Sequence, residues 1–280
     1  MLKPGMTFSL NLQHPRLPEP REHLRCLPSL PYNELAEYFI VTGVQAGDDF
    51  NSQVWLGKPN DAVALVFKFM APSSLDHLLR DDIEGIDRSV EDMIECQEAM
   101  FTGLWDLQGT ALPWFFGIHK VLLSNELAYL LITEYIPHAF ESIPRFSPVD
   151  VGQYIEYVSA FNDAFISKVN QTSDFEKFKT AVQALDLAHS RQIYHLDISK
   201  SNLRFDTSQV VLIDWMNDIS HHKRIKITDP SLIAIIDFRD LVMTFARGEN
   251  GIGKEFFLKM MTDASEIGQR VKALFCQRPA

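Results

Sequence analysis

Four polar side chains lie close together in the second half of the chain, at a spacing that suits proton transfer beside a metal ion. Asp197 follows His195 by two residues, Asn202 comes five residues later, and Asp214 ends an apolar run. An aspartate on a loop can accept a proton from an attacking hydroxyl. An asparagine and a second aspartate at the ends of two paired strands would converge on one hard cation, and Mg²⁺ prefers such oxygen ligands. The stretch therefore predicts a general base next to a magnesium site.

Short strands and helices must hold these groups in place. Residues 203–205 and the four apolar residues 210–213 read as two strands joined by a tight turn at 206–208. Ahead of them, apolar residues recur at helical spacing over 174–189, and a further helix is expected over 149–169. The region is therefore mainly helical, with one small hairpin that carries the polar groups.

The preceding part of the chain has the pattern of an antiparallel sheet. Runs rich in β-branched and aromatic residues occupy 38–44, 53–57 and 62–70, and a helical segment follows over 90–107. Two more apolar runs, 114–123 and 127–135, flank a turn and predict a hairpin. We expect an α+β chain with a small sheet domain over 37–135 and a mostly helical domain over 136–280.

The first 36 residues are expected to form an extended arm or a disordered leader. Six prolines lie between Pro4 and Pro31, and they prevent a regular helix or a central strand. We predict no chemistry for this arm.

Composition excludes several classes of protein. The chain has 280 residues, of which 46% are hydrophobic and 22% charged, and its formal net charge of -11 argues against non-specific nucleic-acid binding. No apolar run is long enough to span a membrane. Three scattered cysteines suggest neither a disulfide framework nor a zinc site. With no signal peptide at the N-terminus, we expect a cytoplasmic or nuclear protein.

The polar stretch resembles a known superfamily. HLDISKSN, beginning at His195, and LIDW, which contains Asp214, are similar to the catalytic loop and the metal-binding aspartate of protein-kinase-like enzymes, which include protein kinases and aminoglycoside-type phosphotransferases. The resemblance implies a two-lobed fold that uses ATP and Mg²⁺ to phosphorylate a hydroxyl. It implies Asp197 as catalytic base, His195 as the structural histidine of the loop, and Asn202 and Asp214 as metal ligands.

The same resemblance extends to the sheet domain. Lys68 interrupts an apolar strand, where a charge is costly unless it is paired or faces a cleft, and it resembles the lysine that contacts nucleotide phosphates. Its expected partner is a helical glutamate: the family spacing points to Gln97, whereas helical geometry favours Glu98 between Ile94 and Phe101, and Glu95 is a third choice. We predict Glu98. Further nucleotide-binding positions implied by the resemblance are Gly47, Val54, Thr133, Glu134, Tyr135 and Ile136.

Several features depart from the family pattern. Asp48 and Asp49 lie where a phosphate-covering loop usually has small neutral residues, and two carboxylates repel a triphosphate. Ser199 replaces the usual lysine of protein kinases, and the aspartate motif continues with Trp215. The main alternative is therefore an inactive pseudokinase that binds or regulates a partner. A metal-dependent hydrolase that uses His195, Asp197 and Asp214 is a second alternative.

Two features near the C-terminus have open interpretations. The basic cluster over 221–226 is either a solvated loop or a grip for an anionic substrate, and its histidines alone make a weak zinc site. Asp237 and Asp240 lie in a helical stretch over 229–245, and one of them resembles the aspartate that anchors the catalytic loop in this superfamily. A last helix over 253–275 is expected to pack in the core. The sequence does not identify the phosphoryl acceptor.

Overall fold

The computed structural model describes residues 2–20, 24–45, 53–59, 63–73, 89–136, 138–139, 173–205, 210–215, 230–246 and 262–276. The chain forms two compact units. Unit 1 comprises Met1–Pro137 with Trp215–Lys226, and unit 2 comprises His138–Asp214 with Ile227–Ala280. The chain is a mixed α/β protein, as its sequence pattern predicts.

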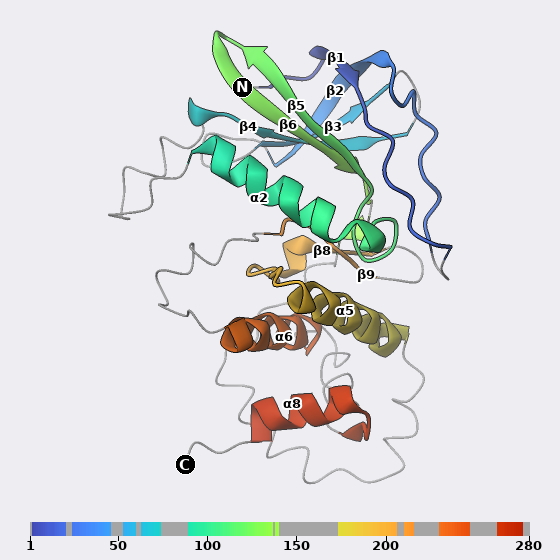
Figure 1. Cartoon of the computed structure of the whole chain (residues 1–280), viewed down its shortest axis with the longest axis vertical. Helices are drawn as coiled ribbons and strands as arrows, with labels where there is room; N and C mark the ends of the chain where they lie inside the picture. Colours follow the sequence, from blue (N-terminus) through green and yellow to red (C-terminus); the bar gives the residue numbers. More distant parts are fainter. Residues whose placement is uncertain are drawn as a thin grey trace. The chain divides into compact units, whose positions relative to one another are not determined.

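Unit 1 is built on a six-stranded antiparallel sheet with the order β1-β2-β3-β4-β6-β5 (Figure 1). Its strands are β1 (Thr7–Asn11), β2 (Leu35–Gln45), β3 (Gln53–Lys58), β4 (Leu65–Met70), β5 (Phe115–Leu123) and β6 (Glu126–Glu134). The predicted strands and the hairpin are confirmed, with ends shifted by a few residues. Ser124 and Asn125 form the hairpin turn at φ 52° and 67°, the left-handed pair that a tight turn between twisted strands favours.

One face of this sheet carries the core of unit 1. Alternate residues of the strands point to this face, and they are buried, as Tyr38, Ile40, Phe67 and Ile132 illustrate. Glycine is required at position 57, because a Cβ there would lie 2.4 Å from the Phe67 ring. The hydrophobic face thus packs closely along its length.

The N-terminal segment covers this face, which corrects the expectation of a separate arm. Strand β1 pairs with β2 at the sheet edge, and Leu2, Leu10 and Leu12 are fully buried in the core. Burial then continues at every third residue, Pro15 and Pro18, as in an extended polyproline-type helix. Prolines exclude a central strand but permit an edge strand and an extended cover, so the segment packs on the sheet.

Helix α2 (Val90–Gly103) packs on the opposite face, followed by the 3₁₀ turn η1 (Trp105–Leu107). Ser89 and Asp92 form a reciprocal capping box that fixes its start. Phe101 stacks on Phe115 of β5 at 4.4 Å between ring centroids, and the Tyr129 hydroxyl donates to Glu91 at 3.0 Å. The predicted helix is confirmed, and these contacts establish which face of the sheet it covers.

Unit 2 combines helices with a small antiparallel sheet of three strands. The strands are β7 (His138–Ala139), β8 (Leu203–Phe205) and β9 (Val210–Leu212), and the helices are α5 (Ser173–Ser190), α6 (Pro230–Ala246) and α8 (Glu266–Cys276), with the 3₁₀ turn η2 (Lys200–Asn202). Phe178 of α5 contacts Phe245 of α6 with ring centroids 5.3 Å apart. Arg270 of α8 pairs with Asp186 of α5 at 2.7 Å.

The helix predicted over 174–189 is confirmed, and the one expected over 149–169 lies outside the described residues. Of the last helix, expected over 253–275, the described portion is α8. Within the described ranges, no helix has both the length and the hydrophobicity needed to cross a membrane.

Candidate functional site

The loop between α5 and β8 presents Asp197 to solvent while its neighbours hold it to the core. Gln192, at φ 61°, lies in the turn that follows α5. Ile193, Tyr194 and Ile198 are buried, whereas the Asp197 side chain is exposed. An exposed carboxylate on a loop held by buried neighbours has a fixed position and stays accessible to a reacting group.

Asn202 fixes the position of Asp197. Its Nδ2 donates to the backbone carbonyl of Asp197 at 2.9 Å and to the carboxylate Oδ2 at 2.8 Å. Both partners are acceptors, so the amide orientation is determined and Oδ1 faces away from Asp197. The structure thus brings Asp197 and Asn202, two of the predicted site residues, together. The Asn202 Oδ1 atom is left to bind a second partner.

Asp214 lies two residues after the end of β9. Strand β9 pairs with β8, which begins directly after Asn202. Leu203 is opposite Leu212 in the β8–β9 register, and the Ile213 amide donates to the Asn202 carbonyl at 2.9 Å. The Asp214 backbone adopts φ 59°, which is strained for a residue other than glycine, and its side chain is exposed. Asn202 and Asp214 therefore lie at the same end of the strand pair. Among the described residues, no three His, Cys, Asp or Glu side chains form a metal-binding cluster.

The ring of His195, for which the resemblance implies a structural role, is fully buried. Burial lowers its pKa, and the negative charges of Asp237, Asp214 and Asp197 oppose that shift. A fully buried ring has no access to a substrate.

Asp237 of α6 anchors the backbone of the loop between α5 and β8. Its buried carboxylate accepts hydrogen bonds from the His195 and Leu196 amides, both at 2.8 Å, and lies 3.0 Å from Nε2 of His189. Leu196 has a positive φ of 66°, and these bonds offset the strain of that backbone. Of the two acids left open by the sequence, Asp237 is the anchor, whereas Asp240 pairs with Arg239 at the surface.

In unit 1, three of the predicted nucleotide-binding residues share one face of the sheet. Val54 is opposite Lys68 in the β3–β4 register, and Thr133 is opposite Val66, two residues before Lys68. Because residues two apart point to the same face, Val54, Lys68 and Thr133 are all on the side that α2 covers. Their role in nucleotide binding stays a prediction.

On α2, the expectation that Glu98 lies on the inner face is wrong. Glu98 is exposed, as is Glu95, whereas Ile94 and Phe101 are buried. Ile94 and Phe101 lie four and eleven residues after Val90, and all three are buried on one stripe of the helix. Gln97 lies seven residues after Val90, so it falls on the same stripe. Gln97 Nε2 donates to the backbone carbonyl of Trp215, a buried residue of the same unit. The pairing of Lys68 with Glu98 remains untested.

The Gln97 contact leads to a prediction about substitutions at this position. Gln97→Glu should destabilise unit 1 by about 1–3 kcal/mol, because a carboxylate would set an acceptor against the Trp215 carbonyl. Gln97→Met keeps the size and removes the amide group without introducing a charge, so we expect a loss of about 1 kcal/mol. Urea unfolding followed by tryptophan fluorescence measures both changes.

Glu98→Gln is the matched control, since an exposed residue of the same helix should change stability by less than about 0.5 kcal/mol. A Gln97→Glu variant as stable as the parent chain would contradict the assigned contact.

Glu134 belongs to the segment that is predicted to bind adenine, and its side chain forms an ion pair with the N-terminal segment. Its carboxylate pairs with Arg25 at 2.9 Å and accepts from the Trp114 amide at 3.1 Å. Tyr135 is half-buried and Ile136 is buried. Sequence reasoning missed Arg25, because nothing in its local pattern indicates a partner 109 residues away.

Other predicted features lie outside the described residues. They are Gly47, the acidic pair Asp48 and Asp49, and the basic cluster over 221–226.

Comparison with known proteins identifies no family. No protein-family model matches the chain, and no curated protein matches its sequence. One similar solved structure is the crystal structure of the PknI kinase domain from Mycobacterium tuberculosis. The TM-score is 0.43 at 14% sequence identity, over 75% of this chain and 74% of that chain. At these values the similarity does not by itself assign a fold or a function.

Proposed function

We propose that this chain is a protein-kinase-like phosphotransferase, which uses Mg-ATP to phosphorylate a hydroxyl group of a protein or a small molecule. The observation that carries the proposal is the arrangement around Asp197. An exposed carboxylate is held at two points by Asn202, on a loop whose backbone is bonded to the buried Asp237. Phosphoryl transfer needs such a positioned base and little covalent help.

The ligand chemistry of unit 2 fits a magnesium ion. The amide Oδ1 of Asn202 and the carboxylate of Asp214 are oxygen donors at the same end of one strand pair. When bound there, Mg²⁺ would neutralise charge on the transferring phosphoryl group. The Asp197 carboxylate, which accepts a hydrogen bond from Asn202, would take the proton from the hydroxyl group that receives the phosphate.

Unit 1 has the residues that we propose bind the nucleotide. A lysine in the middle of a sheet face next to a helix is suited to bind phosphates, and Val54 and Thr133 on the same face would line the base pocket. Glu134, Tyr135 and Ile136 would offer backbone groups to the adenine edge.

An inactive binding module is the second candidate, and Gln97 is the observation that favours it. The neutral amide bonded to the Trp215 carbonyl is on the helix stripe where an active enzyme of this kind would place a carboxylate for Lys68. Such a module would bind partners without transferring phosphate.

A two-step experiment tests the proposal. Thermal unfolding is measured with and without Mg-ATP, and ATP at 100 times its dissociation constant should stabilise the native state by about 2.7 kcal/mol. Transfer from radiolabelled ATP is then assayed against a panel of proteins and hydroxylated metabolites.

A thermal shift accompanied by labelled product supports the phosphotransferase, whereas a shift without any transfer favours the inactive module. Absence of a shift at millimolar Mg-ATP argues against nucleotide binding. Phosphoester hydrolysis with metal and no nucleotide would instead support the hydrolase alternative.

A further inference from the structure

Among the described residues of the N-terminal segment, in which the sequence predicts no chemistry, Arg25 has the charged side chain that makes the most hydrogen bonds. Its Nε and Nη2 donate to the Glu134 carboxylate at 2.9–3.1 Å. Nη2 also donates to the Leu112 carbonyl at 2.6 Å, and Nη1 donates to the Thr110 carbonyl. Both side chains of the ion pair are about nine-tenths buried, with exposures of 8% and 10%.

These bonds tie two segments to the end of β6, the N-terminal segment at Arg25 and the loop over 109–114. The Arg25 amide donates to the Gly109 carbonyl at 2.8 Å, so main chain and side chain both hold the loop that follows η1. Gly109 has φ 73°, and a Cβ there would lie 2.2 Å from the Trp114 ring, so this loop is closely packed. The Glu134 amide donates to the Trp114 carbonyl at 2.9 Å, and the Trp114 amide donates back to the Glu134 carboxylate. The backbone at Glu134 is therefore fixed from both sides.

A forked guanidinium suits this task better than a lysine would. Its planar N–H groups bind a carboxylate at two points and reach two carbonyls in the same geometry. An ordinary surface ion pair would be exposed and would lack the hydrogen bonds that Arg25 donates to two backbone carbonyls. The cluster therefore fixes the position of Glu134, the residue that begins the segment from Glu134 to Ile136.

We propose that Arg25 is a positioning residue for nucleotide recognition, because it fixes the backbone that would bind the adenine edge. The inference rests on the proposed function and deepens it: the N-terminal segment takes part in selecting the base of the nucleotide. Phosphate binding depends on Lys68 and the metal ligands, so it does not depend on Arg25.

This separation of base from phosphates defines the test. Binding of Mg-ATP and of Mg-tripolyphosphate, which lacks a base, is measured by calorimetry on the full chain. In Arg25→Met, Mg-ATP should bind about tenfold more weakly, the equivalent of one lost hydrogen bond, whereas Mg-tripolyphosphate should bind within about twofold of the parent. A residue with a purely structural role would weaken both ligands alike.

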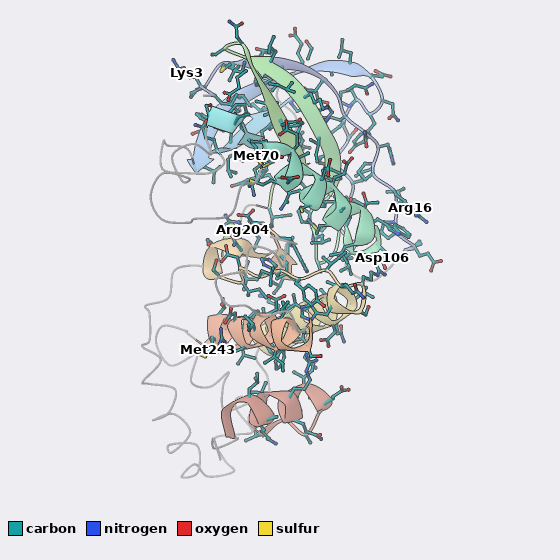
Figure 2. The ribbon with its side chains drawn as sticks, turned by 60° about the vertical axis from the view of Figure 1, so that its left-hand side comes forward. Lys3, Arg16, Met70, Asp106, Arg204 and Met243 are labelled. Atoms are coloured by element: carbon teal, nitrogen blue, oxygen red, sulfur yellow. The ribbon has the colours of Figure 1, made fainter. Side chains whose placement is uncertain are left out.

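Arg16→Met is the matched control. Arg16 belongs to the same segment, and its guanidinium lies 3.6 Å over the Trp105 ring, at the end of α2 near Asp106 (Figure 2). It makes no bond to Glu134, so this variant should bind both ligands as the parent chain does.

A second variant covers the case in which Arg25→Met does not fold. Arg25→Met/Glu134→Met removes both buried charges, which relieves the unpaired carboxylate. Loss of Mg-ATP affinity with retained tripolyphosphate affinity in this variant supports the inference. Unchanged Mg-ATP affinity, or an equal loss of both ligands, overturns it while the proposed function stands. A parent chain that binds neither ligand overturns the proposed function, and the inference with it.

Discussion

Asp197→Asn is expected to slow phosphoryl transfer by roughly 10²- to 10⁴-fold, the usual contribution of a general base. The Asp197 side chain is exposed, so the substitution disturbs no core packing. The side-chain oxygen of asparagine can still accept the bond from Asn202 Nδ2, which keeps the loop in place. Stability and Mg-ATP affinity should therefore stay near those of the parent chain.

The measurement compares transfer rates at saturating Mg-ATP, with ATP binding and thermal unfolding recorded on the same samples. Asp186→Asn is the control, since this aspartate of unit 2 pairs with Arg270 and has no place in the site. An Asp197→Asn variant with the parent's turnover would refute the assigned base.

Asp237→Asn is expected to lower the free energy of unfolding by about 3 kcal/mol, the largest stability effect of any single substitution proposed for this chain. The carboxylate is 1% exposed and accepts from two backbone amides and from the His189 ring. An asparagine offers one oxygen, so its NH₂ group would face a donor and leave a buried amide without an acceptor. The variant should also lose phosphoryl transfer, because Asp197 lies on the loop that Asp237 holds.

Urea unfolding at equilibrium measures the loss, with the slope against urea expected to stay the same. Asp240→Asn, three residues further along α6, removes a surface partner of Arg239 and should change stability by no more than about 0.5 kcal/mol. A loss below about 1 kcal/mol in Asp237→Asn would show that the loop is held by other contacts.

The strands of unit 1 can be predicted because each obeys a local rule. Aromatic and β-branched residues are concentrated in β3 and β4, and the turn between β5 and β6 has residues that tolerate a positive φ. The predicted spacing of Asp197 and Asn202 corresponds to a direct contact, because the two residues are separated by a single short turn.

Contacts between distant segments give no such local signal. Arg25 and Glu134 are 109 residues apart, and neither position breaks a pattern in its own neighbourhood. The prolines of the N-terminal segment suggest disorder, although extended chain with every third residue buried is compatible with them. Which partner an extended segment finds is decided by tertiary packing.

The buried face of a helix is an intermediate case, because the helical period can be counted along the sequence. Gln97 is seven residues from Val90 and four from Phe101, and this places it on the buried stripe of α2, whereas Glu98 is one residue off it. Asp237 lies four residues from both Ile233 and Leu241, which are fully buried, so an acid inside an apolar stripe is a signal for an anchored carboxylate.

The place of β1 at the edge of the sheet decides how recombinant versions of the chain can be trimmed. A clone begun at residue 37 would lack β1 and leave the start of β2, up to Ile40, with unpaired backbone groups beside the exposed apolar residues Phe39 and Val41. A bare apolar edge recruits the same edge of another molecule and promotes aggregation. Material for crystallisation or assay should therefore retain the sequence from Leu2 onward.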